Sequence, residues 1–139
     1  MTDQNLSEPA SQPQDATVVV SRTVAFPVRQ VWRVLMTKDG AEAMLGPGAQ
    51  FGEKGHSWVA ENGRTGVMRS LHPLEEIRFS YRRDEQAAPT TVELALQAEE
   101  DATVLTVTHS KLEPDMDLDD LRTRWQAALD RVADHLAQL

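Results

Sequence analysis

The chain ends in DLDDLRTRWQAALDRVADHLAQL, residues 117–139, and this stretch decides the fold. Its apolar residues recur every three or four positions, which places them on one face of a helix. They are Leu118, Leu121, Trp125, Ala128, Leu129, Val132, Leu136 and Leu139. The opposite face carries Arg122, Arg124, Asp130, Arg131 and Asp134. Asp117 is a candidate N-cap, and Asp120 adds favourable negative charge to the first turn. A helix of about 20 residues is about 30 Å long, and so wide an apolar face requires a sheet to pack against.

Upstream segments in which apolar and polar residues alternate predict the strands of that sheet. The alternation runs through residues 77–82, 92–97 and 105–109. Each such strand has one buried and one solvated face, which is typical of antiparallel sheet. Asn62-Gly63 is the strongest hairpin signal in the chain, and it joins residues 56–61 to residues 64–72.

The front of the chain predicts one strand and two short helices. Residues 17–25 form the strand, and Arg22 shares the parity of Val18, Val20 and Val24, which fits either an edge position or a strand end. Pro27 suits the first turn of a short helix. Ala41–Leu45 predicts a second short helix, which Gly46-Pro47-Gly48 ends. The element order therefore predicts an α+β fold with an antiparallel sheet packed against a long C-terminal helix.

Composition limits the classes of partner. The chain has 139 residues, enough for one domain, and residues 1–16 have the polar composition of a disordered tail that precedes a domain at 17–139. A net charge of −8 argues against nucleic acid and anionic membranes as partners. Cysteine is absent, so no thiolate can bind a metal or act as nucleophile. The sequence also shows no signal peptide and no apolar run long enough to span a bilayer, and we therefore expect a cytoplasmic protein.

Several short blocks carry a family resemblance. They are residues 21–27 (SRTVAFP) with Val31-Trp32, residues 66–73, residues 77–81 (IRFSY), residues 102–109 (ATVLTVTH) and residues 125–129 (WQAAL). In this order they resemble the SRPBCC superfamily, also called START-like or Bet v 1-like. More narrowly, they are similar to bacterial homologues of the activator of the heat-shock-protein-90 ATPase. The resemblance spans residues 17–139. It departs at residues 44–49 (MLGPGA), where many relatives carry tryptophans.

The resemblance implies a helix-grip fold, in which a curved antiparallel sheet wraps around the long C-terminal helix and two short helices follow the first strand. Members often enclose an apolar cavity between sheet and helix. The strand parities in this chain aim a set of large side chains at that space, and these are the candidate ligand-binding residues. They are Trp58, Phe79, Tyr81, Leu94, Leu96, Leu105, Val107, His109 and Trp125. Such side chains either wall a cavity or fill the core.

Catalytic signals are few. The four histidines show no spacing typical of a metal site, and no serine has a neighbour that would activate it. His109 follows the parity of the buried positions in its strand, so we expect it to face inward, either as a ligand contact or as a histidine with satisfied hydrogen bonds. The acidic runs 99–101 and 115–120 are interpreted as solvated turns and a helix start. We predict no catalytic residue, metal or cofactor.

Three classes of function fit this sequence. The first is a non-enzymatic domain that binds a small apolar or amphipathic molecule between the sheet and the C-terminal helix, which we favour. The second is a protein-binding module of the co-chaperone type, with a protein partner or a second copy of the chain. The third is a cyclase or hydrolase of the kind found elsewhere in the superfamily. The fold does not separate them, because function depends on the site.

Overall fold

A computed structural model describes residues 16–138 of the chain. The elements in order are β2 Ala16–Val24, α1 Val28–Leu35, α2 Lys38–Leu45, β3 Ser57–Val59, β4 Thr65–His72, β5 Glu76–Tyr81, β6 Thr90–Glu99, β7 Ala102–Leu112 and α3 Leu118–Ala137. This order confirms the predicted α+β helix-grip fold. The predicted disordered tail lies outside the described residues except for Ala16, which begins β2.

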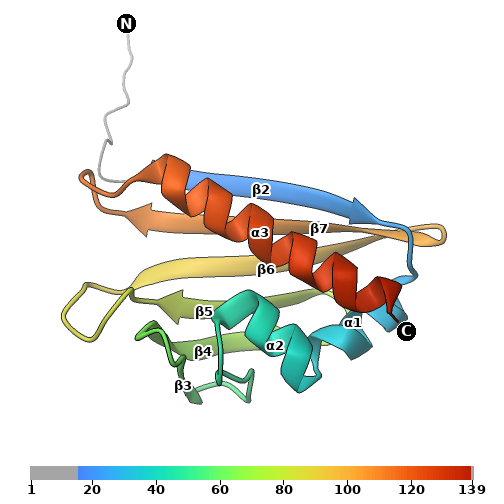
Figure 1. Cartoon of the computed structure of the whole chain (residues 1–139), viewed down its shortest axis with the longest axis horizontal. Helices are drawn as coiled ribbons and strands as arrows, with labels where there is room; N and C mark the ends of the chain where they lie inside the picture. Colours follow the sequence, from blue (N-terminus) through green and yellow to red (C-terminus); the bar gives the residue numbers. More distant parts are fainter. Residues whose placement is uncertain (1–15, 139) are drawn as a thin grey trace, which may run out of the picture.

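The strands form one six-stranded antiparallel sheet in the order β2-β7-β6-β5-β4-β3. Of the two alternatives for the first strand, the structure shows the edge position, since β2 pairs only with β7. Figure 1 shows α3 running diagonally across one face of the sheet, with α2 beside it over the same face. The long β6–β7 ladder, from Thr91↔Ser110 to Glu99↔Ala102, lies beneath α3.

The helix α3 has the phase that its sequence predicts. Its buried side chains are Leu121, Trp125, Ala128, Leu129, Val132 and Leu136. The side chain of Asp117 caps its start by accepting a hydrogen bond from the Asp120 backbone N–H at 3.1 Å. An apolar stripe of this width buries enough surface to hold the helix on the sheet without help from its exposed residues.

The second short helix begins earlier than its apolar residues suggest. It starts at Lys38 because the Thr37 side chain accepts a hydrogen bond from the Gly40 N–H at 3.1 Å and so caps the first turn. Gly40 also packs tightly against the end of α1, where a Cβ atom would lie 1.9 Å from the Val34 carbonyl oxygen. The helix ends at Gly46, whose φ of +117° is unfavourable for any other residue.

A glycine in β4 leaves room for the Trp58 side chain and for close approach of β5. Gly66 pairs with Trp58, and a Cβ atom on Gly66 would lie 2.0 Å from the Ser80 carbonyl oxygen and 2.7 Å from Trp58 Nε1. The β4–β5 ladder is irregular here, and the Val67 N–H donates to the Ser80 hydroxyl instead of to a backbone carbonyl. Glycine in a strand often marks such a bulge with close backbone approach.

Replacing Gly66 with alanine should therefore destabilise the domain by about 3 kcal/mol, because the added methyl group forces β5 and Trp58 to move. Chemical denaturation measures this change. Gly55→Ala is the matched control, since Gly55 has a φ of +91° but open space around its Cα. The control variant should lose only about 1 kcal/mol of unfolding free energy, which comes from backbone strain at the positive φ. Equal losses in the two variants would contradict the close contact at Gly66.

Candidate functional site

The structure brings the nine predicted ligand-binding side chains together in the interior between the sheet and α3. All are buried, from 0% exposure for Phe79 to 8% for Leu96. The aromatic members interlock: Tyr81 lies 5.1 Å from His109 and 5.6 Å from Trp125, and Trp58 lies 6.1 Å from Tyr81, measured between ring centroids. Tyr81 and Trp125 also line a pocket, whereas the cluster as a whole packs as core.

His109 is fully buried at the centre of this cluster, and both of its ring nitrogens have partners. Trp125 Nε1 donates to His109 Nδ1 at 3.0 Å, and His109 Nε2 lies 2.7 Å from Thr90 Oγ1. Because the Thr90 hydroxyl already donates to the Tyr81 carbonyl oxygen at 2.8 Å, it accepts from His109 Nε2–H. One nitrogen donates and the other accepts, so the partners select the neutral imidazole.

The environment of His109 opposes protonation. Burial lowers its pKa from 6.5 to about 4. A proton on Nδ1 would also face the Trp125 N–H, which is a donor with no lone pair to offer. His109 therefore acts as a structural hydrogen-bonding group between β6, β7 and α3 at neutral pH.

A pocket of about 510 Å³ opens between α2 and α3. Its wall consists of Asp39, Glu42, Ala43, Met44 and Leu45 of α2, the turn residues Gly46, Pro47 and Asn62, then Arg64, Tyr81, and Arg124, Trp125, Ala128, Arg131 and His135. Tyr81 is 3% exposed and Trp125 1%, so the pocket reaches the interior cluster. Its inner wall is therefore formed by side chains that pack between the sheet and α3.

Three arginines give this pocket its polar groups. The Arg64 Nε–H donates to the Tyr81 hydroxyl at 2.7 Å, and Arg131 Nη2 donates to the Ala43 carbonyl oxygen at 2.9 Å. Arg124 also lines the pocket. Of the acidic residues in the wall, Glu42 accepts from Gly48 N–H at 2.7 Å and from Lys38 at 3.1 Å, and these contacts lower its carboxyl pKa.

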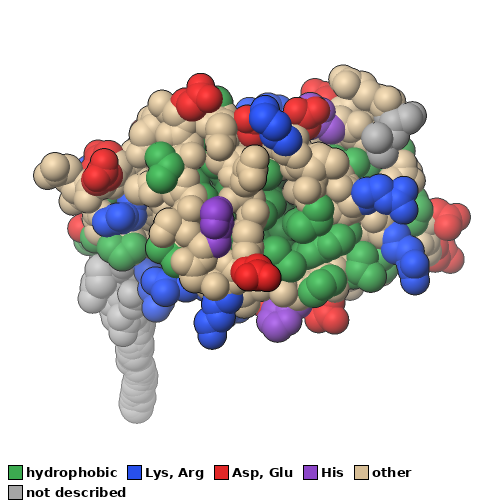
Figure 2. Space-filling model, turned by 90° about the horizontal axis from the view of Figure 1, so that it is seen from below, with side chains coloured by type: hydrophobic (Ala, Val, Ile, Leu, Met, Phe, Trp, Pro, Cys, Tyr) green, Lys and Arg blue, Asp and Glu red, His purple; other side chains and the backbone are tan. Residues whose placement is uncertain are grey.

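A larger hollow of about 850 Å³ lies beside the first pocket, over the corner between α1 and α2 and the end of β4. Its apolar wall is formed by Leu35, Met36, Ala41, Phe51 and Leu71. Lys38, Lys54, Arg69 and His72 also line it, together with Glu53. Figure 2 looks onto this side of the molecule and shows hydrophobic side chains gathered in a depression flanked by basic ones. This second hollow contains none of the predicted site residues.

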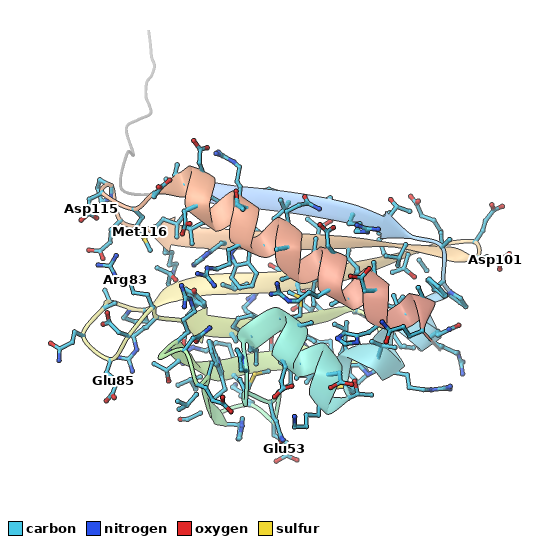
Figure 3. All side chains as sticks on the ribbon, in the orientation of Figure 1. Glu53, Arg83, Glu85, Asp101, Asp115 and Met116 are labelled. Atoms are coloured by element: carbon cyan, nitrogen blue, oxygen red, sulfur yellow. The ribbon has the colours of Figure 1, made fainter. Side chains whose placement is uncertain are left out.

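Several charged side chains of the loops lie on the outside of the molecule. Figure 3 shows Glu53, Glu85, Asp101 and Asp115 projecting outward at the rim of the molecule. The runs 99–101 and 115–117 are exposed apart from half-buried Met116, in agreement with their interpretation as solvated turns. Within residues 16–138 no group of three His, Asp or Glu side chains is placed to hold a metal ion. No helix in the same range is long and apolar enough to cross a membrane.

The arginines and the α2 residues of the first pocket were absent from the sequence prediction. Arg124 and Arg131 were assigned to the polar face of the C-terminal helix. Their seven-residue separation places them on one side of that helix, and this spacing is the signal that could have joined them. Arg64 carries no comparable signal, because its position depends on how the β3–β4 hairpin meets α2 and α3.

The family model described as "Activator of Hsp90 ATPase homolog 1-like protein" matches residues 23–137. The chain belongs to this family. Its fold and the family match place the domain in the SRPBCC superfamily, as the sequence blocks indicated. A search of curated proteins finds no match.

Several solved structures share the helix-grip fold. DynU16, from the dynemicin biosynthetic locus, is 22% identical with a TM-score of 0.74, and the match covers 87% of this chain and 47% of DynU16. The chain thus spans about half the length of that protein. CalU16 from Micromonospora echinospora is 20% identical with a TM-score of 0.74, covering 88% and 76%. The Aha1 dimer from Colwellia psychrerythraea is 19% identical with a TM-score of 0.73, covering 87% and 96%. At these identities the likeness is one of fold.

His109 should make stability depend on pH. Above pH 6.5 the imidazole is neutral in both the folded and the unfolded chain, and its full contribution to the free energy of unfolding is present. As the pH falls from 6.5 toward about 4, only the unfolded chain takes up the proton, so stability decreases by up to about 1.4 kcal/mol per pH unit. Between pH 7 and pH 5 the difference in unfolding free energy between wild type and His109→Gln should narrow by about 2 kcal/mol.

Urea denaturation at the two pH values measures this difference, and the titration of the carboxylates cancels in the comparison. His72→Gln serves as the control because His72 is exposed. Its difference from wild type in unfolding free energy is the reference for the comparison. A His109→Gln variant that keeps the pH slope of the wild type would rule out a neutral buried imidazole.

Proposed function

We propose that this domain binds a small amphipathic molecule between the sheet and the C-terminal helix without converting it. The observation that carries this proposal is the pocket of about 510 Å³ between α2 and α3, which reaches Tyr81 and Trp125. Pockets for small molecules typically measure about 300 to 1,000 Å³ and combine apolar walls with a few polar groups. Met44, Leu45 and Ala128 supply apolar wall here, and the arginines supply polar groups.

The chemistry around the pocket supports binding over catalysis. His109 is the buried residue best suited by type to act as a general base, but Trp125 and Thr90 occupy both of its nitrogens. Its lowered pKa also makes it a weak base at neutral pH. The Tyr81 hydroxyl accepts a hydrogen bond from the Arg64 Nε–H, and this bond fixes its orientation. A hydroxyl held in this way suits the positioning of a ligand. Cytoplasmic location and function without a cofactor stay predictions from the sequence.

Binding should be visible at the Trp125 indole. We expect at least one member of a panel of fatty acids, polyketide-like aromatics and terpenoids to bind with a Kd below about 100 μM, or about −5.5 kcal/mol. In ¹H–¹⁵N NMR titrations the Trp125 indole N–H signal should shift, whereas the Trp32 indole signal on α1 should stay in place. A panel with no binder at this level, or shifts confined to residues outside the pocket, would refute the proposal.

A pair of helix variants provides the matched test of location. Ala128 lines the pocket, whereas its neighbour Ala127 lies on the side of α3 toward β2. Ala128→Met should fill part of the pocket and weaken binding about tenfold, while Ala127→Met should bind like wild type. Melting temperatures of both variants establish that each remains folded, since added volume in a packed interior can itself destabilise.

Self-association is the second candidate, and the hollow at the α1–α2 corner favours it. Met36 lines this hollow and is 40% exposed, and an apolar depression is a common site of protein association. The related Aha1 from Colwellia psychrerythraea is described as a dimer.

If a second copy covers the hollow, sedimentation velocity should show a dimer that Met36→Glu converts to monomer. Val59→Glu is the control, because Val59 is 64% exposed on β3 outside the hollow. A monomer at all concentrations would exclude this role.

A further inference from the structure

We infer that the pocket between α2 and α3 selects amphipathic anions, in particular apolar carboxylates, and that Arg64, Arg124 and Arg131 bind the anionic group. This inference rests on the proposed function and specifies its ligand class. It is drawn from the arrangement of the guanidinium groups around an apolar floor.

Each arginine keeps most of its hydrogen-bonding capacity. A guanidinium carries five N–H donors. Arg64 donates one hydrogen bond, from Nε to the Tyr81 hydroxyl, and Arg131 donates one, from Nη2 to the Ala43 carbonyl oxygen. Arg124 has no hydrogen bond or ion pair with any residue from 16 to 138. Two of the three groups are thus held in place by single contacts, with their remaining donors available to a ligand.

The carboxylates nearby do not satisfy these arginines. Among the described residues, ion pairs form at Arg22, Lys38, Arg78 and Arg122, which leaves the three pocket arginines outside every pair. The Glu42 carboxylate is engaged by Lys38 and Gly48. Asp39 lies in the first turn of α2, where the helix dipole favours its charge.

Unpaired arginines around one pocket contrast with the net charge of −8 for the whole chain. An acidic surface offers many carboxylates to a cation, yet none of these three arginines forms an ion pair with a carboxylate in residues 16–138. A ligand carboxylate would supply the missing acceptors, because it accepts two parallel bonds from a planar guanidinium. Its apolar body would then lie against Trp125, Leu45 and Ala128, which line the same pocket.

The test compares octanoate with octanamide, which have the same length and nearly the same shape but differ in charge. NMR titrations at low ionic strength give the two dissociation constants for the full chain. We expect octanoate to bind about tenfold more tightly than octanamide, in keeping with the strength of a charge-assisted hydrogen bond. Arg124→Gln should remove this preference with little loss of stability, because Arg124 has no partner among residues 16–138. High salt should reduce the preference in the wild type.

Arg122→Gln is the matched control. Arg122 lies on the same helix, two residues from Arg124, and pairs with Asp119 outside the pocket at 2.8 Å. This variant removes the same charge and should retain the preference for octanoate. Equal binding of octanoate and octanamide by the wild type would overturn the inference while the proposed function stands. Equal loss of preference in both variants would overturn the assignment to the pocket arginines. Absence of binding by either probe and by the wider panel would overturn both.

Discussion

The hydrogen bond from Trp125 to His109 determines how the long helix sits on the sheet. Apart from the exposed Arg22–Asp130 ion pair, the rest of the contact between α3 and the sheet is mainly apolar, and apolar surfaces alone tolerate sliding and rotation. A donor on α3 and an acceptor on β7 specify one register, because any displacement leaves both groups buried without a partner. Thr90 and Tyr81 extend the same network into β5 and β6. The positions of Tyr81 and Trp125, and therefore the floor of the α2–α3 pocket, follow from this register.

Periodicity was sufficient to predict the architecture. The three- and four-residue spacing of α3 and the alternation in β5, β6 and β7 come directly from which faces are buried. Arg22, which interrupts an otherwise apolar parity, was compatible with an edge position or a strand end, and the pairing of β2 with β7 alone decides for the edge. The start of α2 was placed too late, at Ala41 instead of Lys38. The Thr37 cap and the close approach of Gly40 to α1 decide that boundary, and neither appears as hydrophobic periodicity.

The pocket was less predictable, because its shape depends on how side chains fill space. Parity showed that Trp58, Tyr81 and Trp125 face inward, but not whether they enclose a void or close it. The Trp58 indole packs close to Gly66 and is buried, a contact that parity does not predict. Residues 44–49, where the chain departs from many relatives, include four that line the α2–α3 pocket. The arginines around it come from α3 and from the residue before β4, so only tertiary structure brings Arg64 to the other two.

The inward charge on β2 has a consequence for aggregation. An edge strand of nine residues exposes a row of backbone groups that could template another strand, and Val19 on this edge is 55% exposed. Arg22 reaches from the strand to Asp130 on α3 and forms an ion pair there. If the β2 strand of a second molecule paired with this edge, its own Arg22 and Asp130 would come next to the first pair on the face of the sheet that α3 covers. These charges would then need solvent or partners. The residue that breaks the apolar pattern of β2 therefore protects the open side of the sheet from growing into a fibril-like array.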